Sequence, residues 1–184
     1  MEIDVRREAW SLHCMEGGKD MSQVNLFMYT NEHYEQCDAF ILPEEQIQFT
    51  TFPTEVVSEA LENPDKFPVV IKKGLEVVGF FVLHLNPPKT HRTDERSVLL
   101  RAFSIDARHQ KQGYAKEAMM QLPAFVQAHF PEVTAITLAV NKKNIAAKSL
   151  YFKTGYVDTL QSVMGPIGEQ HILAFDLQKE TAPQ

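Results

Sequence analysis

The chain has 184 residues, of which 44% are apolar, and a formal net charge of −6 at pH 7. This length and apolar content predict one globular domain with a core of ordinary size. The negative charge argues against nucleic-acid binding, and the longest apolar run, residues 77–83, is too short to span a bilayer, so we expect no membrane partner and a cytoplasmic location.

Cysteine and histidine usage gives no metal signal. Cys14 and Cys37 are the only cysteines, the seven histidines are scattered, and neither C-x-x-C nor H-E-x-x-H occurs. Such a pattern predicts neither a disulfide scaffold nor a bound metal.

Residues 1–20 differ from the rest of the chain. They contain five acids and three bases without a sustained apolar period, and Met21 follows them. The codons of residues 16–18 can supply a ribosome-binding sequence for a start at Met21. We therefore expect residues 1–20 to be a non-native or disordered leader and residues 21–184 to form a single domain; a genuine mobile tail is the alternative.

Beyond this leader, apolar spacing and turn residues predict strands mixed with helices. Strands are expected at residues 24–29, 67–73, 76–85, 97–105, 134–140, 156–164 and 170–177, and helices at residues 31–40, 43–50, 54–62, 113–130 and 144–154. Asn31 and Thr54 are the expected N-caps, Gly155 is the expected C′ residue of the last helix, and Pro123 should bend or briefly break its helix near Met119. This order predicts an α/β (α+β) fold, a mixed sheet with helices on both faces.

An anion site is predicted where the strand at residues 97–105 passes through a polar turn into a helix that opens at Gly113. The first backbone N–H groups of a helix have no intrahelical partner and attract phosphate. The phosphate-loop pattern G-x-x-x-x-G-K-S/T and the dinucleotide pattern G-x-G-x-x-G are both absent. The pattern that is present is Gln110-x-x-Gly113-x-Ala115.

That pattern, together with the block LAVNKKNIAAKSLYFKTGY at residues 138–156, resembles the GNAT family of N-acetyltransferases. The resemblance spans roughly residues 67–175. It implies a mostly antiparallel sheet of six to seven strands, acetyl-CoA as co-substrate without a metal, and transfer of an acetyl group to a primary amine. A flavodoxin-like nucleotide or redox protein would instead need its phosphate loop after the first strand.

The resemblance also implies which residues bind acetyl-CoA. Pantetheine would pair with the strand edge at residues 103–105, and the diphosphate would lie on the following loop. The implied residues are Phe103, Ser104, Ile105, Gln110, Lys111, Gln112, Gly113, Tyr114, Ala115, Lys116, Asn141 and Asn144. Arg108 would add positive charge there. Tyr151 would protonate the departing thiolate, because a phenol near pKa ~10 and a thiol near ~8.5 exchange a proton with little free-energy difference.

The general base departs from the pattern of the better-known members of the family, because Arg101 occupies the place of their strand glutamate. An arginine cannot accept a proton. Glu45, His84 and Glu95 are the alternatives, or water relays the proton. Arg101 is then expected to bind an acceptor's carboxylate or to pair with an acidic residue near the N-terminus.

The resemblance implies that the helices near the N-terminus wall the site of the acceptor, which is expected to be a small cationic amine. Here residues 31–65 contain nine carboxylates and neither lysine nor arginine. Such a wall attracts a polyamine, an aminoglycoside or a lysine side chain, although acidic helix faces are also commonly just solvated. A non-catalytic acyl-CoA sensor and a protein or peptide acetyltransferase are the alternatives. The enzyme would be a monomer or a homodimer.

Overall fold

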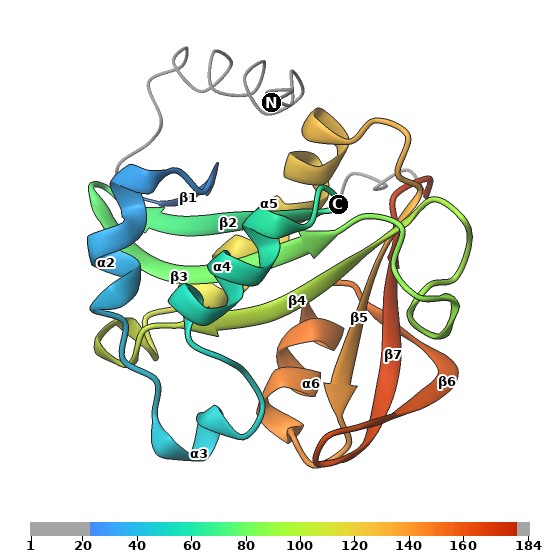
Figure 1. Cartoon of the computed structure of the whole chain (residues 1–184). Helices are drawn as coiled ribbons and strands as arrows, with labels where there is room; N and C mark the ends of the chain where they lie inside the picture. The colour runs from blue at the N-terminus through green and yellow to red at the C-terminus, as the bar shows by residue number, and fades with distance from the viewer. Residues whose placement is uncertain (1–22, 180–184) are drawn as a thin grey trace.

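The computed structural model describes residues 23–179, and the predicted leader lies outside them. Within these residues seven strands form one sheet in the order β1-β2-β3-β4-β5-β7-β6 (Figure 1). The strands are β1 (Val24–Met28), β2 (Lys66–Lys73), β3 (Glu76–His84), β4 (Ser97–Ile105), β5 (Ala135–Asn141), β6 (Val157–Gly165) and β7 (Gly168–Asp176). Only β4 and β5 run parallel. The predicted mixed, mostly antiparallel sheet is confirmed.

Helices cover both faces of the sheet, as predicted (Figure 1). They are η1 (Asn31–His33), α2 (Tyr34–Asp38), α3 (Glu44–Ile47), α4 (Pro53–Glu62), η2 (Lys89–His91), η3 (Ala107–His109), α5 (Tyr114–His129) and α6 (Ile145–Lys153). Met119 and Leu122 of α5 are buried in the same core cluster as Phe81 of β3. Val57 of α4 belongs to the opposite cluster, which also contains Phe80. Burial of these two apolar faces drives the assembly.

The parallel strands β4 and β5 pair only along their first halves. Their register runs from Ser97 opposite Ala135 to Leu100 opposite Leu138 and then ends. Figure 1 shows β4 and β5 fanning apart beyond that point, with α6 beside the gap. Because the two strands separate inside the sheet, their backbone edges become available to another extended chain.

A bulge in β4 lies next to this gap. The β3–β4 register shifts between Phe80 and Val82, so that both Ala102 and Phe103 lie opposite Phe81. Ala102 has a φ of 51°, which is unusual for a residue other than glycine. A bulge bends its strand and turns the following side chains.

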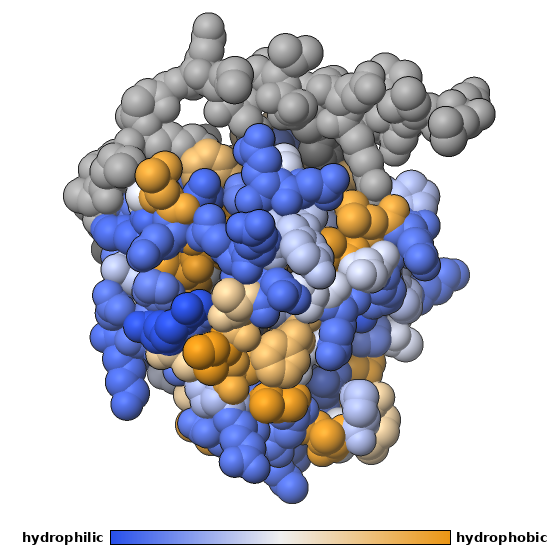
Figure 2. Space-filling model, turned by 60° about the vertical axis from the view of Figure 1, so that its left-hand side comes forward, coloured by the Kyte–Doolittle hydropathy of each residue, from blue (hydrophilic) through white to orange (hydrophobic). Residues whose placement is uncertain are grey.

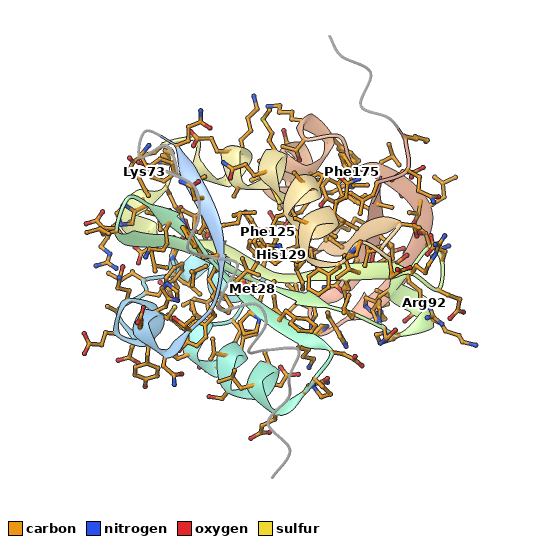
Figure 3. All side chains as sticks on the ribbon, turned by 90° about the horizontal axis from the view of Figure 1, so that it is seen from above. Met28, Lys73, Arg92, Phe125, His129 and Phe175 are labelled. Atoms are coloured by element: carbon orange, nitrogen blue, oxygen red, sulfur yellow. The ribbon has the colours of Figure 1, made fainter. Side chains whose placement is uncertain are left out.

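The brief break predicted near Met119 does not occur, because α5 is one continuous helix from Tyr114 to His129; the bend at Pro123, the other expectation, stays a prediction. Proline removes the hydrogen bond to the carbonyl of Met119. Packing of Met119, Leu122 and Val126 against the sheet compensates for this loss, since all three side chains are buried. Viewed from above, Phe125 and His129 of α5 lie near the middle of the molecule, whereas Lys73 and Arg92 lie at its rim (Figure 3).

The first two helical segments before β2 are shorter than predicted, whereas α4 begins one residue earlier than predicted. Thr30, not Asn31, is the N-cap of the first helical turn. Phe52, not Thr54, is the N-cap of α4, and Pro53 is its first helical residue. Proline suits the first position of a helix because its missing N–H would be unpaired there. The face shown in Figure 2 is mostly hydrophilic, with separate hydrophobic patches. None of the helices described is both long and apolar enough to cross a membrane.

Candidate active site

A cleft of about 1440 Å³ opens where β4 and β5 separate. Residues 99–105 of β4 and 138–141 of β5 line its two strand edges. The rest is lined by the loop before α5, by residues 45–51, by parts of α4, α5 and α6, by His91 and by residues near the β6–β7 turn. The cleft therefore joins segments that lie far apart in the sequence.

The loop before α5 presents its backbone amides to this cleft. Lys111 and Gly113 both have positive φ angles, 61° and 86°. Among residues 23–179, the N–H groups from Lys111 to Lys116 donate no backbone hydrogen bond. Successive free amides at a helix start form an anion-binding concavity. Lys111 and Lys116 line the cleft beside it, whereas Gln112 does not.

Gln110 holds this loop in place. Its Nε2 donates to the carbonyl of Ile105 at 2.9 Å, which closes the turn between β4 and α5. Its side chain also exchanges hydrogen bonds with Gln46 from α3. The loop is thus fixed both to its own strand and to the opposite wall of the cleft.

Arg108 is turned away from the cleft, because it pairs with Asp106. Its Nη2 lies 2.6 Å from Oδ2 of Asp106, a carboxylate that is fully buried, and also donates to the carbonyl of Ala39. The expected contribution of Arg108 to the anion site is therefore replaced by a structural role. Lys111 and Lys116 remain as the lysines of the anion site.

Three cleft-lining residues have a buried polar atom without a partner among the described residues: Thr50, Ser104 and Asn141. Oγ of Ser104 on β4 and Nδ2 of Asn141 on β5 lie on opposite sides of the gap. Burying such atoms unpaired costs about 1–3 kcal/mol each. Their position suits a ligand that carries its own amide groups and lies between the strands.

The helix α6 carries Tyr151 to the same cleft. Oδ1 of Asn144 accepts from the N–H of Ala147 at 3.1 Å and so caps the start of α6. At the other end, Gly155 donates to Phe152, and Tyr156 donates to the carbonyl of Tyr151, which is a Schellman motif with the predicted glycine at C′. These caps fix the helix that carries the Tyr151 side chain.

Residues 29–156 match the Acetyltransferase (GNAT) family. The chain belongs to this family. Over 152 residues it is 43% identical to the uncharacterized N-acetyltransferase YbbJ of Bacillus subtilis (strain 168), and the alignment covers 82% of this chain and 95% of that relative. The protein is an N-acetyltransferase, and the resemblance seen in the sequence is confirmed.

Solved GNAT structures share the fold at low sequence identity. AAC(6')-Ib in complex with paromomycin and acetyl-CoA gives a TM-score of 0.70 at 15% identity, covering 88% of this chain and 99% of that one. Spermidine N-acetyltransferase from Vibrio cholerae with CoA and spermine gives 0.64 at 15% identity, covering 86% and 98%.

Tyr151 of this GNAT protein is buried, and burial raises the pKa of its phenol well above the usual range. Tyr151 therefore holds its proton at neutral pH, as a general acid must. The raised pKa also makes proton loss to a thiolate less favourable than the sequence argument assumed. Tyr156 lies 5.9 Å away between ring centroids, and its hydroxyl has no partner among residues 23–179.

The GNAT cleft is lined by charges of both signs. Lys111 and Lys116 lie by the loop, whereas Glu45, Glu55 and Glu59 line the walls formed by α3 and α4. Of the three alternatives for the base, only Glu45 lines the cleft, because His84 lies beyond its wall and Glu95 pairs with Arg92 at an exposed turn.

Sequence reasoning did not single out five titratable residues of the cleft: Glu55, Glu59, His91, His109 and Lys143. In the sequence, Glu59 was considered only as one of the nine carboxylates of residues 31–65. Its spacing from the apolar residues of the same helix could have suggested that it faces inward. His91 belongs to η2, and its own backbone carbonyl accepts a hydrogen bond from the hydroxyl of Thr137 in β5 at 2.6 Å. No local pattern predicts that contact. Among residues 23–179, no cluster of His, Cys, Asp and Glu could hold a metal ion.

Proposed function

We propose that this N-acetyltransferase transfers the acetyl group of acetyl-CoA to the primary amine of a small cationic acceptor. The observation that carries the proposal is the charge arrangement of the cleft. Free amides, Lys111 and Lys116 lie at the loop before α5, and Glu45, Glu55 and Glu59 line the walls formed by α3 and α4. This arrangement suits a diphosphate at the loop and an ammonium group at the acidic wall.

The donor end would hold coenzyme A through backbone groups. The amides from Lys111 to Lys116 would receive the diphosphate. Ser104 and Asn141 would supply the partners that pantetheine amides need, and thereby satisfy their own unpaired atoms. The edge of β4 at residues 103–105 and Asn144 flank the same path.

The chemistry requires three proton movements by residues of the chain. The ammonium of the acceptor loses a proton to a carboxylate of the acidic wall, directly or through water, and Glu45 is our candidate. The amine nitrogen then forms a bond to the carbonyl carbon while the carbon–sulfur bond breaks. Tyr151 donates its hydroxyl proton to the departing sulfur, and the second proton that the new amide nitrogen must lose returns to the Tyr151 oxygen through water.

The acceptor class follows from Glu45, Glu55 and Glu59, which favour cationic amines. The fold neighbours named above are an enzyme crystallised with the aminoglycoside paromomycin and a spermidine acetyltransferase. They make polyamines and aminoglycosides sensible first probes. A lysine side chain in a peptide is the second candidate, since the cleft is wide.

The full chain should therefore be incubated with acetyl-CoA and a panel of polyamines, aminoglycosides, amino acids and lysine peptides, with release of free thiol as the readout. We expect thiol release that depends on the amine. Binding of coenzyme A without thiol release on any amine would contradict catalysis and favour an acyl-CoA sensor, a function that the absence of a strand glutamate at residue 101 would allow.

A further inference from the structure

Arg101 offers hydrogen-bond donors to the cleft that no described residue uses. It is the first β4 residue after the last β4–β5 pair, it lines the cleft, and its side chain is 40% exposed. Within residues 23–179 its one ion-pair contact is a distant one, 4.0 Å from Nη1 to Oε1 of Glu59. A guanidinium has five N–H donors in a planar fork. Most of these donors are therefore available to a ligand in the cleft.

Glu59 does not neutralise Arg101, because Lys66 lies much closer to it. The ammonium of Lys66 is buried and makes both a hydrogen bond and an ion pair with Oε1 of Glu59. That hydrogen bond is also the leading reason why the pKa of Glu59 lies below its usual range. Lys66 and Glu59 therefore compensate each other, and the charge of Arg101 remains available.

The two imidazoles near Arg101 do not neutralise its positive charge. Burial lowers the pKa of His84 and of His91, and Arg101 lowers both further. Both rings are therefore neutral at pH 7. Asp65 acts on His84 and accepts a hydrogen bond from Asn86, but it does not line the cleft.

Arg101 is also separate from the loop that we assign to the diphosphate. Ile105, the last residue of β4, lies four positions after Arg101, which is at most about 13 Å along the bulged strand. The loop that begins at Lys111 lies beyond that point. One diphosphate cannot reach both places, so Arg101 serves a second anionic group.

We propose that Arg101 forms a carboxylate subsite, so that the acceptor is an amine whose molecule also carries a carboxylate group. This inference rests on the proposed acetyl transfer and narrows its substrate class. The planar fork of an arginine matches a carboxylate with two parallel hydrogen bonds. The amino group then lies toward Glu45 and Glu55, so that the acceptor spans a positive strand and a negative wall.

The test uses amines that differ only at the carboxylate. Lysine, lysinamide and cadaverine share one amine chain, and ornithine, ornithinamide and putrescine form a shorter series. We expect kcat/KM for thiol release from acetyl-CoA to favour the amino acid in at least one series by about 10- to 100-fold, the effect of losing charged hydrogen bonds.

Variants of the full chain then link this preference to Arg101. Arg101→Gln should reduce the ratio of kcat/KM between acid and diamine to within about threefold, and Arg101→Lys should restore part of it. Lys89→Gln removes an exposed charge near His91 but outside the cleft, and should leave the ratio unchanged. Comparing ratios between variants cancels the intrinsic reactivity of each amine.

Four outcomes would overturn or redirect the inference. Turnover of diamines without any preference for the acids, or a preference that survives Arg101→Gln, overturns the subsite and leaves acetyl transfer standing. No thiol release with any amine overturns the proposed function itself. Turnover of succinyl-CoA in preference to acetyl-CoA, lost in Arg101→Gln, places the carboxylate on the acyl chain and overturns its placement on the acceptor.

Discussion

Gln46 and Gln110 exchange two side-chain hydrogen bonds across the cleft, one of 3.2 Å from Nε2 of Gln46 and one of 3.1 Å from Nε2 of Gln110. Gln46 belongs to α3 on the acidic wall, and Gln110 belongs to the loop before α5. The two walls that we assign to acceptor and coenzyme are therefore joined directly. A shift of the loop must therefore strain or move α3.

We expect this pair to couple the two walls energetically. Gln46→Ala should lower the free energy of unfolding by about 1 kcal/mol, the ordinary net value of a hydrogen bond. Gln110→Ala should cost more, because it also loses the bond to Ile105. Urea unfolding of the single and double variants gives the coupling energy. Strictly additive effects would show that the pair contributes nothing.

Tyr151→Phe tests the proposed general acid. Loss of the hydroxyl should lower kcat about 100-fold or more, while the KM for acetyl-CoA stays within about threefold, because a proton donor acts on the transition state. The matched control is Tyr156→Phe, which removes a buried hydroxyl that has no partner within the described chain and does not line the cleft. Equal losses of kcat in both variants would assign the effect to packing.

Gly113→Val tests the anion site. Gly113 has a φ of 86° and open space around it, so a side chain there would meet the approaching ligand before it met the protein. We expect binding of coenzyme A to weaken by at least about 100-fold in calorimetry. Gly168→Val is the control, because Gly168 also has a positive φ and open space but does not line the cleft. Unchanged affinity in Gly113→Val would place the diphosphate elsewhere.

Ser104→Ala tests the path between the strands. Its hydroxyl is buried without a described partner, so removing it should leave the free energy of unfolding unchanged or slightly increased. The affinity for coenzyme A should nevertheless fall about fivefold, because a ligand amide would lose its partner. Affinity equal to that of the unchanged protein would show that the ligand does not use this hydroxyl.

The parts of this fold that sequence could predict depend on local physics. Alternation of apolar residues located the strands, and the Gly113 start of α5 followed from its place between a strand and an amphipathic segment. Gly155 was predictable because a C′ residue needs a positive φ, which glycine adopts without cost. Whether Pro123 would bend or break α5 could not be decided from the sequence, because tertiary packing decides it.

The parts of the candidate site that sequence missed depend on contacts between distant segments. Ala102 adopts a positive φ that alanine does not favour by itself, and only the β3–β4 register explains the bulge. The pairing of Gln46 with Gln110 and the approach of His91 to the cleft span long separations in the chain. Sequence pattern contains no signal for such contacts without related sequences to compare.

Asp106 makes the stability of the loop depend on pH. Its carboxylate is fully buried, and burial alone would raise its pKa, but hydrogen bonds from the side chain and N–H of Arg108 and from the N–H of Ile41 hold the pKa below the ordinary value of 3.8. The ionised form is thus favoured in the folded state. Its stabilising effect is complete above about pH 4 and is lost as the pH falls through the lowered pKa.

Asp106→Asn should therefore lower the free energy of unfolding by about 2 kcal/mol at pH 7, since the amide cannot accept all of these hydrogen bonds. The difference from the unchanged protein should shrink between pH 4 and pH 2, measured by urea unfolding at each pH. Glu95→Gln is the control, because its exposed pair with Arg92 contributes less than about 1 kcal/mol at any pH. A difference that stays constant down to pH 2 would contradict the preference for an ionised Asp106 in the fold.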